Sequence, residues 1–369
     1  MLDALRMTLP IVQAPMAGVS TPALAAAVSN AGGLGGIAVG ATDADGARGM
    51  IAALRARLDR DAAFNVNLFV HPRAIADRDR ERRWLDALAP RFAAFGAAPP
   101  AALRTIYTSF ADDPAMLAML AEVAPPVVSF HFGLPSAAAI AMLRACGVFL
   151  LATATSPAEA RMVEAAGIDA IVAQGIEAGG HRGVFDPAAP DDALGTMALV
   201  RLLVREVRVP VVAAGGIMDG AGIAAALRLG AVAAQLGTAF VACPESAADA
   251  GYRAALAGPR AYHTTMTSLI SGRPARALAN RFTALAGDLA GLVPPDYPIA
   301  YDAGKALHAA ATARGESGFG AHWAGQGAPL ARAMPAARLV ATLMRETDAA
   351  EPPPQLRDGV SRMTSDRPR

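Results

Sequence analysis

The chain has 369 residues, of which 54% are hydrophobic and 18% are charged, and this composition excludes an intrinsically disordered protein. Lysine and arginine together number 33 and the acidic residues 32, so the formal net charge is only +1. That balance argues against a general nucleic-acid or membrane-surface binder, which would need a basic excess. The two cysteines lie far apart without a C-x-x-C motif, so neither a disulfide framework nor a metal site is expected.

The N-terminal sequence has no charged start followed by a long apolar run, so no secretion signal is expected. The chain also lacks any uninterrupted apolar run of about 18 residues, the length needed to cross a bilayer. These observations predict a cytoplasmic protein without a membrane span.

Eight short, apolar, β-prone runs recur along the chain, separated by stretches rich in alanine and leucine. They cover residues 10–16, 34–40, 63–70, 126–132, 148–154, 169–175, 209–216 and 231–240. The runs do not alternate between apolar and polar residues, which is typical of strands buried on both faces. Eight strand–helix units predict an α/β fold whose parallel sheet closes into a (β/α)8 TIM barrel, with an open doubly wound sheet as the alternative.

Three of the intervening stretches carry clear helix boundaries. Polar residues that can cap a helix, Thr21, Ser156 and Asp219, precede them, and each stretch ends at a glycine. Proline follows the first two caps, at the first helical position, where a missing N–H has no cost. These boundaries support helices between the strands.

Two regions interrupt the strand–helix pattern. Residues 71–125 contain a charged run and predict a solvated helix followed by a long crossover, whereas residues 246–319 predict a mostly helical subdomain over the C-terminal face of the barrel. The predicted barrel comprises residues 1–245 and 320–350 and ends in a closing eighth helix within 329–347. Residues 351–369 are polar and predict a mobile tail.

Glycines follow the seventh and eighth predicted strands, where barrels of this type usually bind phosphate. Gly215 and Gly216 present backbone N–H groups with no Cβ in the way, and Gly237 and Thr238 offer N–H groups and a hydroxyl. Because both loops carry this feature, an anion site is favoured over the alternative of two tight turns.

The sixth predicted strand ends in a polar, glycine-rich loop that contains His181. Histidine can give or take a proton near neutral pH, so His181 is a candidate catalytic residue, the alternative being a buried structural histidine. Gly179 and Gly180 would let the backbone pack against a planar ligand. Gln174 can donate and accept, which matches the edge of a heterocycle, and Asn67 places a second amide at the top of another strand.

Two further strand ends carry residues of interest. His131 ends the fourth predicted strand and either faces the same pocket or packs in the core. Met16 ends the first and either forms an apolar wall against a flat ligand or is core packing. Both alternatives remain open at this point.

An ordered set of motifs resembles the nitronate monooxygenase family, formerly called 2-nitropropane dioxygenases. The motifs lie between about residues 10 and 345 and read PIVQAPMAG, NVNLF, VVSFHFG, QGIEAGGHRG, VPVVAAGGI, QLGTAF, SGRPARALANRF and HWAGQ. The AGGH segment and the AAGG and QLGT pair are shared with relatives that reduce quinones or enoyl-thioesters. VSFHFG, SGRPAR and WAGQ favour the first class of the family, which acts on propionate 3-nitronate.

The resemblance implies a TIM barrel that holds FMN non-covalently, with His181 as the catalytic residue and no metal. The implied flavin contacts, together with those suggested by the loops, are Met16, Asn67, Gln174, Gly179, Gly180, Gly215, Gly216, Gln235, Leu236, Gly237 and Thr238. Tyr297, Tyr301 and Lys305 lie where this class places substrate-pocket groups, and His131 is a further candidate.

The implied reaction is the oxidative denitrification of an alkyl nitronate with O2, which gives a carbonyl compound and nitrite or nitrate. The first alternative keeps the fold and the flavin but makes the protein an NAD(P)H-dependent reductase of quinones or enoyl-thioesters. The second is a barrel that binds a phosphorylated metabolite without redox chemistry. The expected partners are a small nitronate and O2, without nucleic acid or membrane, and the expected state is a monomer or homodimer.

Overall fold

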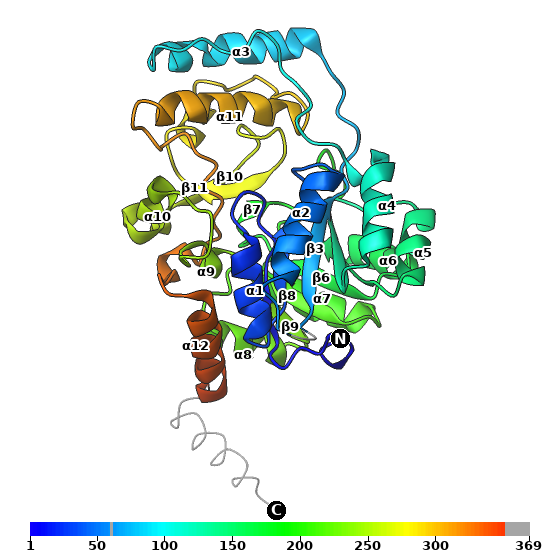
Figure 1. Ribbon diagram of the computed structural model, residues 1–369. Helices are drawn as coiled ribbons and strands as arrows, with labels where there is room; N and C mark the ends of the chain where they lie inside the picture. The colour runs from blue at the N-terminus through cyan, green and yellow to red at the C-terminus, as the bar shows by residue number, and fades with distance from the viewer. Residues whose placement is uncertain (60–61, 351–369) are drawn as a thin grey trace, which may run out of the picture.

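The computed structural model describes residues 1–59 and 62–350, and its centre is an eight-stranded parallel barrel (Figure 1). The strands pair in the order β1-β9-β8-β6-β5-β4-β3-β2, and a parallel bridge between Val12 and Leu34 joins β1 to β2. The barrel strands are β1 (Ile11–Gln13), β2 (Gly35–Ala38), β3 (Phe64–Phe69), β4 (Val127–His131), β5 (Phe149–Ala154), β6 (Ala170–Gln174), β8 (Val211–Ala214) and β9 (Ala233–Leu236). The predicted (β/α)8 barrel is confirmed.

The predictions for the last two barrel strands were wrong at their C-terminal ends. β8 stops at Ala214 because Gly215 adopts a φ of +129°. β9 stops at Leu236, and the residues predicted to continue it form the short helix α9 (Thr238–Val241). Both loops therefore begin earlier than the apolar pattern indicates.

The inward-facing residues of the barrel change character from one end to the other. Val127, Leu151 and Val172 belong to an apolar cluster in the barrel interior. Two residues further along each strand, on the same face, come Ser129, Thr153 and Gln174. The apolar side chains fill the interior at the N-terminal ends of the strands. The polar side chains line an opening at the C-terminal ends.

Eight helices surround the barrel. They are α1 (Pro22–Asn30), α2 (Ala44–Arg55), α4 (Pro114–Val123), α5 (Ala137–Ala145), α6 (Pro157–Ala165), α7 (Thr196–Glu206), α8 (Gly220–Arg228) and α12 (Ala336–Ala349). The predicted caps Thr21, Ser156 and Asp219 each accept a hydrogen bond from a backbone N–H in the first turn. α12 packs on α8 and α1, which confirms the predicted closing helix.

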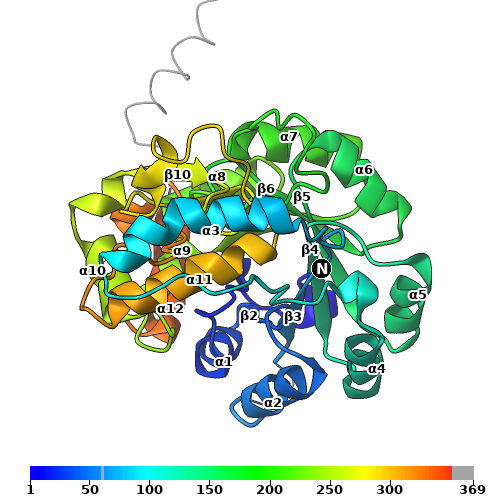
Figure 2. The same cartoon turned by 90° about the horizontal axis from the view of Figure 1, so that it is seen from above.

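Two long helices lie side by side across the C-terminal face of the barrel (Figure 1, Figure 2). They are α11 (Ile299–Thr312), within the predicted insertion, and α3 (Arg78–Ala93), which precedes it by about 200 residues. The prediction of a merely solvated helix in this charged stretch was wrong, because Trp84, Leu88 and Phe92 recur at helical spacing and are buried in one cluster with residues of α11.

The insertion after β9 also contains a small sheet that the sequence analysis did not predict. β11 (Ala275–Leu278) pairs antiparallel with β10 (Thr264–Thr267) on one side and with β7 (Gly180–His181) on the other. The helix α10 (Ala250–Ala257) lies beside this sheet (Figure 1). The pairing fixes the backbone of His181 to the cover rather than to the barrel alone.

The predicted division into barrel and covering subdomain stays a prediction, and the predicted tail lies outside the described residues. Within the described residues, no helix is both long enough and apolar enough to cross a membrane.

Candidate active site

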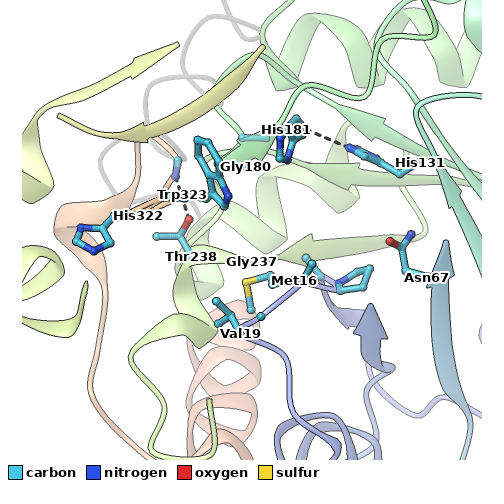
Figure 3. A pocket seen from close by; sticks show the side chains of 18 of the residues that line it. Met16, Val19, Asn67, His131, Gly180, His181, Gly237, Thr238, His322 and Trp323 are labelled. Atoms are coloured by element: carbon cyan, nitrogen blue, oxygen red, sulfur yellow. Dashed lines mark hydrogen bonds between the residues drawn. The ribbon is translucent and has the colours of Figure 1, made fainter. Parts of the chain in front are cut away.

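A cavity of about 440 Å³ lies at the C-terminal ends of the barrel strands, between the barrel and α11 (Figure 3). This volume is typical of sites for small molecules and cofactors. Every residue proposed above for a site lines the cavity except Leu236, whose side chain is fully buried in the hydrophobic core. The loops of the separate strands thus converge on one pocket.

The imidazole of His181 is held from one side and open on the other. Its Nε2 lies 2.9 Å from Oγ of Ser271, a residue that is fully buried. Its Nδ1 has no hydrogen-bond partner among the described residues and is accessible from the cavity. Nδ1 is therefore the nitrogen that a bound molecule can reach.

His131 supports the His181 loop instead of presenting a free nitrogen. Its Nε2 lies 3.1 Å from the backbone oxygen of His181, and its Nδ1 lies 3.0 Å from Oγ1 of Thr153. A carbonyl can only accept, so Nε2 carries the proton and Nδ1 accepts from the threonine hydroxyl. Both ring nitrogens are used within the chain, and the ring can meet a substrate only through its carbon atoms.

Gln174 has a similar supporting role. Its Nε2 donates to the backbone oxygen of His181 at 3.0 Å, and its Oε1 accepts from the backbone N–H of Gly183 at 2.7 Å. The neighbouring Arg182 is buried and forms a bidentate ion pair with Asp191. The amide of Gln174 keeps one N–H and one lone pair for a ligand.

The surroundings of His181 disfavour its charged form. Burial, the neighbouring His131 and the guanidinium of Arg273 lower the pKa of His181 to about 3. Burial and the guanidinium groups of Arg273 and Arg182 lower the pKa of His131 to about 4, against its hydrogen bond to the backbone of His181. Both rings are neutral at physiological pH, so His181 can accept a proton there. An anion bound next to it would raise its pKa again.

The glycine loops at the ends of β8 and β9 form the other side of the pocket. Gly215 and Gly216 have φ values of +129° and +69°, in the region that other residues rarely adopt. A Cβ on Gly215 would lie 2.5 Å from Oγ1 of Thr196. Within the described part of the chain, the N–H groups of both glycines have no acceptor. Both glycines line the cavity, at the loop where an anion site was expected.

The segment that follows Trp323 interlocks with the His181 loop. A Cβ on Gly179 would lie 2.4 Å from the backbone nitrogen of Gly325, and one on Gly325 would lie 2.6 Å from the backbone oxygen of Glu177. The same Gly325 N–H donates to Oγ1 of Thr238 at 3.0 Å (Figure 3). Gly179 is therefore required by this close approach of two backbones, and the hydroxyl of Thr238 still has its own proton to donate.

Aromatic rings enclose His181 on the side of the cover. The ring centroids of Trp323, Tyr297 and Phe132 lie 5.0, 5.3 and 5.6 Å from that of His181. The hydroxyl of Tyr297 is buried without a partner among the described residues, and burial raises its pKa well above the ordinary value. The aromatic wall makes this end of the pocket largely apolar.

The single lysine of the chain stands at the edge of this wall. Nζ of Lys305, on α11, lies 5.3 Å from the ring centroids of both Tyr107 and Tyr301. The tyrosine hydroxyl of Tyr301 accepts from Nε1 of Trp323 at 3.4 Å. Lys305 is exposed to solvent yet lines the cavity, so it can attract a negatively charged group to the entrance.

Comparison with known proteins identifies the family. The model of the family described as nitronate monooxygenase matches residues 1–346. The chain belongs to the nitronate monooxygenase family. A nitronate monooxygenase of Paraburkholderia phytofirmans is 65% identical over 346 residues, which cover 94% of each chain. A second one, from Pseudomonas aeruginosa, is 60% identical over 339 residues, which cover 91% of this chain and 95% of that protein.

A solved structure supports the same family membership. A nitroalkane oxidase from Streptomyces ansochromogenes superimposes with a TM-score of 0.86 at 43% identity, covering 95% of this chain and 99% of that one. The expected membership of the nitronate monooxygenase family, and with it an oxidoreductase, is confirmed, and these relatives favour it over the reductase alternative.

Enzymes of the nitronate monooxygenase family depend on a flavin, and the cavity has suitable groups for one. The unpaired N–H groups of Gly215 and Gly216 suit a phosphate. At the other end, Nδ2 of Asn67 donates to Ser129, which leaves Oδ1 open toward the cavity to accept from a ring N–H. Met16 lies between Thr238 and Asn67 in Figure 3 and supplies an apolar surface.

Three residues at or behind the pocket were missed by the sequence analysis. Trp323 lies in the HWAGQ motif, which served only to mark the family. Ser271 lies directly before the GRPAR segment, but nothing local pairs it with a histidine 90 positions away. Tyr107 comes from the long crossover after α3 and reaches the pocket only because α11 lies beside that crossover.

Proposed function

We propose that this member of the family is an FMN-dependent nitronate monooxygenase. It oxidises alkyl nitronates with O2 to a carbonyl compound and nitrite or nitrate, and propionate 3-nitronate is the candidate substrate. The observation that carries the proposal is the open Nδ1 of a neutral His181 inside an aromatic pocket, opposite a row of unpaired backbone N–H groups.

The residues that would hold FMN come from the C-terminal ends of five barrel strands and from the segments that follow them. Gly215, Gly216, Gly237 and Thr238 would bind its phosphate, while Asn67, Gln174, Gln235 and Met16 would contact the ring system, with Gly179, Gly180 and the backbone of Leu236 close by. Bound FMN supplies the electron transfer from the substrate to O2, which no side chain of the pocket can perform. The protein contributes position, charge and the exclusion of water.

His181 has two tasks in this proposal. With a nitronate, which has already lost its α-proton, the tautomer protonated on Nδ1 donates a hydrogen bond to a nitro oxygen and so positions the carbon, while Nε2 accepts from the hydroxyl of Ser271. With a neutral nitroalkane, Nδ1 removes the α-proton, and the proton on Nε2 stays in the contact with Ser271. His131 contributes by holding the His181 backbone.

The substrate end of the pocket is formed by Tyr297, Tyr301, Tyr107 and Lys305. The tyrosine rings offer apolar walls for a short carbon chain. Lys305 offers the only lysine charge in the chain, which suits the carboxylate of propionate 3-nitronate. A nitronate without a carboxylate would lack this contact.

The purified protein tests the proposal directly. We expect a flavin visible spectrum, and rapid O2 uptake with propionate 3-nitronate but not with NADH. If anaerobic NADH bleached the flavin quickly while the nitronate gave no turnover, the reductase alternative would replace this proposal. A colourless protein that FMN cannot reconstitute would favour a barrel without redox chemistry.

A further inference from the structure

Arg273 is a buried cation without a counter-ion. Its side chain is 2% exposed, and no carboxylate in the described ranges forms an ion pair with it. One Nη atom donates to the backbone oxygen of Val184, while Nε has no partner among the described residues. Burial lowers its pKa only to about 10, so it remains charged at neutral pH. A buried unpaired charge costs stability, which calls for an explanation beyond packing.

One aromatic ring contacts both the guanidinium of Arg273 and the two histidines of the candidate site. It lies 4.3 Å from the ring centroid of Phe132, and that ring lies 4.6 Å from His131 and 5.6 Å from His181. Phe132 has a φ of +79°, which a bulky side chain rarely adopts. The backbone is thus held in an unfavourable conformation at the residue that separates the cation from both histidines.

No carboxylate among the described residues raises the pKa of His181 or His131. The groups that face His181 from other elements are His131, Tyr297, Tyr301, Trp323, Ser271 and, through Phe132, Arg273. All but Arg273 are neutral at pH 7. Two carboxylates attract Arg273 from a distance, Glu159 and Asp186. Both already accept backbone hydrogen bonds elsewhere. Arg182, next to His181, is paired with Asp191 but still contributes to the lowered pKa of His131.

We propose that Arg273 is a positioning residue of this site: its buried charge against Phe132 adds to the effect of burial in disfavouring the protonation of His181 and His131, and it makes the pocket attractive to an anionic substrate. The second half of this proposal rests on the proposed function, because a nitronate is an anion. The first half does not, since it concerns only the protonation of two rings. Arg273 does not line the cavity, so it acts without touching the substrate.

The first experiment follows the titration of the histidine ring protons by NMR in the purified full chain, with signals assigned from His181→Gln and His131→Gln. In Arg273→Met we expect both midpoints to rise by about one pH unit or more, because a like charge has been removed. Arg273→Lys, which keeps a charge, should raise them less. The control is Arg205→Met, which removes an exposed arginine of α7 and should leave both midpoints unchanged.

Two results would overturn the proposal. One is that the histidine midpoints are the same in Arg273→Met and in the parent protein, or that they shift equally in Arg273→Met and Arg273→Lys. Either outcome would show that the side chain of Arg273 acts through packing and not through its charge. The other needs no variant of Arg273: a midpoint for His181 near 6.5 in the parent protein would show that the ring is not held neutral.

A second experiment tests the attraction for anions. In Arg273→Met we expect KM for propionate 3-nitronate to rise about tenfold, while KM for a neutral nitroalkane stays within about twofold, because only the former carries charge. Equal changes for the two substrates would contradict the electrostatic role. If the NMR shift appeared but no nitronate were oxidised even by the parent protein, the proposed function would fail and the role of Arg273 in histidine protonation would stand.

Discussion

Nε2 of His181 and Oγ of Ser271 lie 2.9 Å apart, and this contact joins β7, which follows the sixth strand of the barrel, to the loop before β11. The serine oxygen also lies 3.2 Å from the backbone oxygen of Arg273, to which it can donate. A hydroxyl in this position can serve either tautomer of the imidazole, because it both donates and accepts. The contact fixes which nitrogen faces the pocket.

Replacing Ser271 should therefore misorient the histidine. We expect Ser271→Ala to lower kcat/KM for a neutral nitroalkane about tenfold, which corresponds to one hydrogen bond of about 1.4 kcal/mol. In a protein that already carries His181→Ala, the same change should cause no further loss, since the two residues act as a unit. Steady-state kinetics of the two single variants and the double variant measure this, and additive losses would contradict the pairing.

Removing His181 should separate the two kinds of substrate. We expect His181→Ala to lower turnover of a neutral nitroalkane about 100-fold or more, because a general base usually accelerates its reaction by at least this factor. Turnover of the corresponding nitronate should fall less than about tenfold, since that substrate has already lost its proton. The exposed His263→Ala serves as the control and should change neither rate. Equal losses on both substrates would rule out the base assignment.

The glycine loops predict a specific loss of cofactor binding. Gly216 and Gly315 both have positive φ values, +69° and +78°, but only the first lines the cavity, and nothing lies within 4 Å of a Cβ built on the second. Each glycine-to-alanine change should destabilise the fold by about 1 kcal/mol through backbone strain. Only Gly216→Ala should also weaken FMN binding, about tenfold or more, in a fluorescence titration. Equal FMN affinity in both variants would place the phosphate elsewhere.

The buried histidines predict a loss of stability in acid. Burial lowers the pKa of His131, His181 and His322 to about 4, 3 and 4, whereas the unfolded chain binds protons at these rings near pH 6.5. Between those values the unfolded state holds more protons, so the stabilising contribution is complete above pH 6.5 and declines as the pH falls toward 3. Urea unfolding at pH 7.5 and pH 5 measures the difference.

A variant isolates the histidine contribution from that of the carboxylates. We expect His131→Gln to reduce the stability difference between pH 7.5 and pH 5 by about 1–2 kcal/mol, because one buried ring no longer resists protonation. The exposed His263→Gln should leave the difference unchanged. A pH dependence that is identical in both variants would show that His131 titrates normally.

The barrel was predictable because its information is local. Apolar runs mark the strands, and caps such as Thr21 and Asp219 mark the helix starts, so each strand–helix unit could be identified without its neighbours. Most pocket residues were predictable for the same reason, since parallel strands bring their C-terminal ends together. The place of His181 and Gly216 in the pocket could be predicted from their positions directly after predicted strands.

The cover was harder to predict because it depends on distant pairing. Trp84 and Leu307 share a cluster although more than 200 residues separate them, and the charged face of α3 hides this in the sequence. The antiparallel pairing of Ala275 with His181 is likewise absent from any local pattern. The engaged nitrogens of His131 could not be foreseen, because hydrogen-bond partners follow from side-chain geometry and not from residue type.

The interlock of Gly179 with Gly325 bears on how the protein is made. The segment that completes the pocket is synthesised about 145 residues after the loop that it locks, and only a short 3-10 turn (Ala328–Leu330) and α12 follow it in the described chain. While translation is under way, a nascent chain that has already formed all its barrel strands still lacks one wall around the flavin. Retention of the cofactor thus becomes a late step of biosynthesis, which follows the synthesis of all the barrel strands.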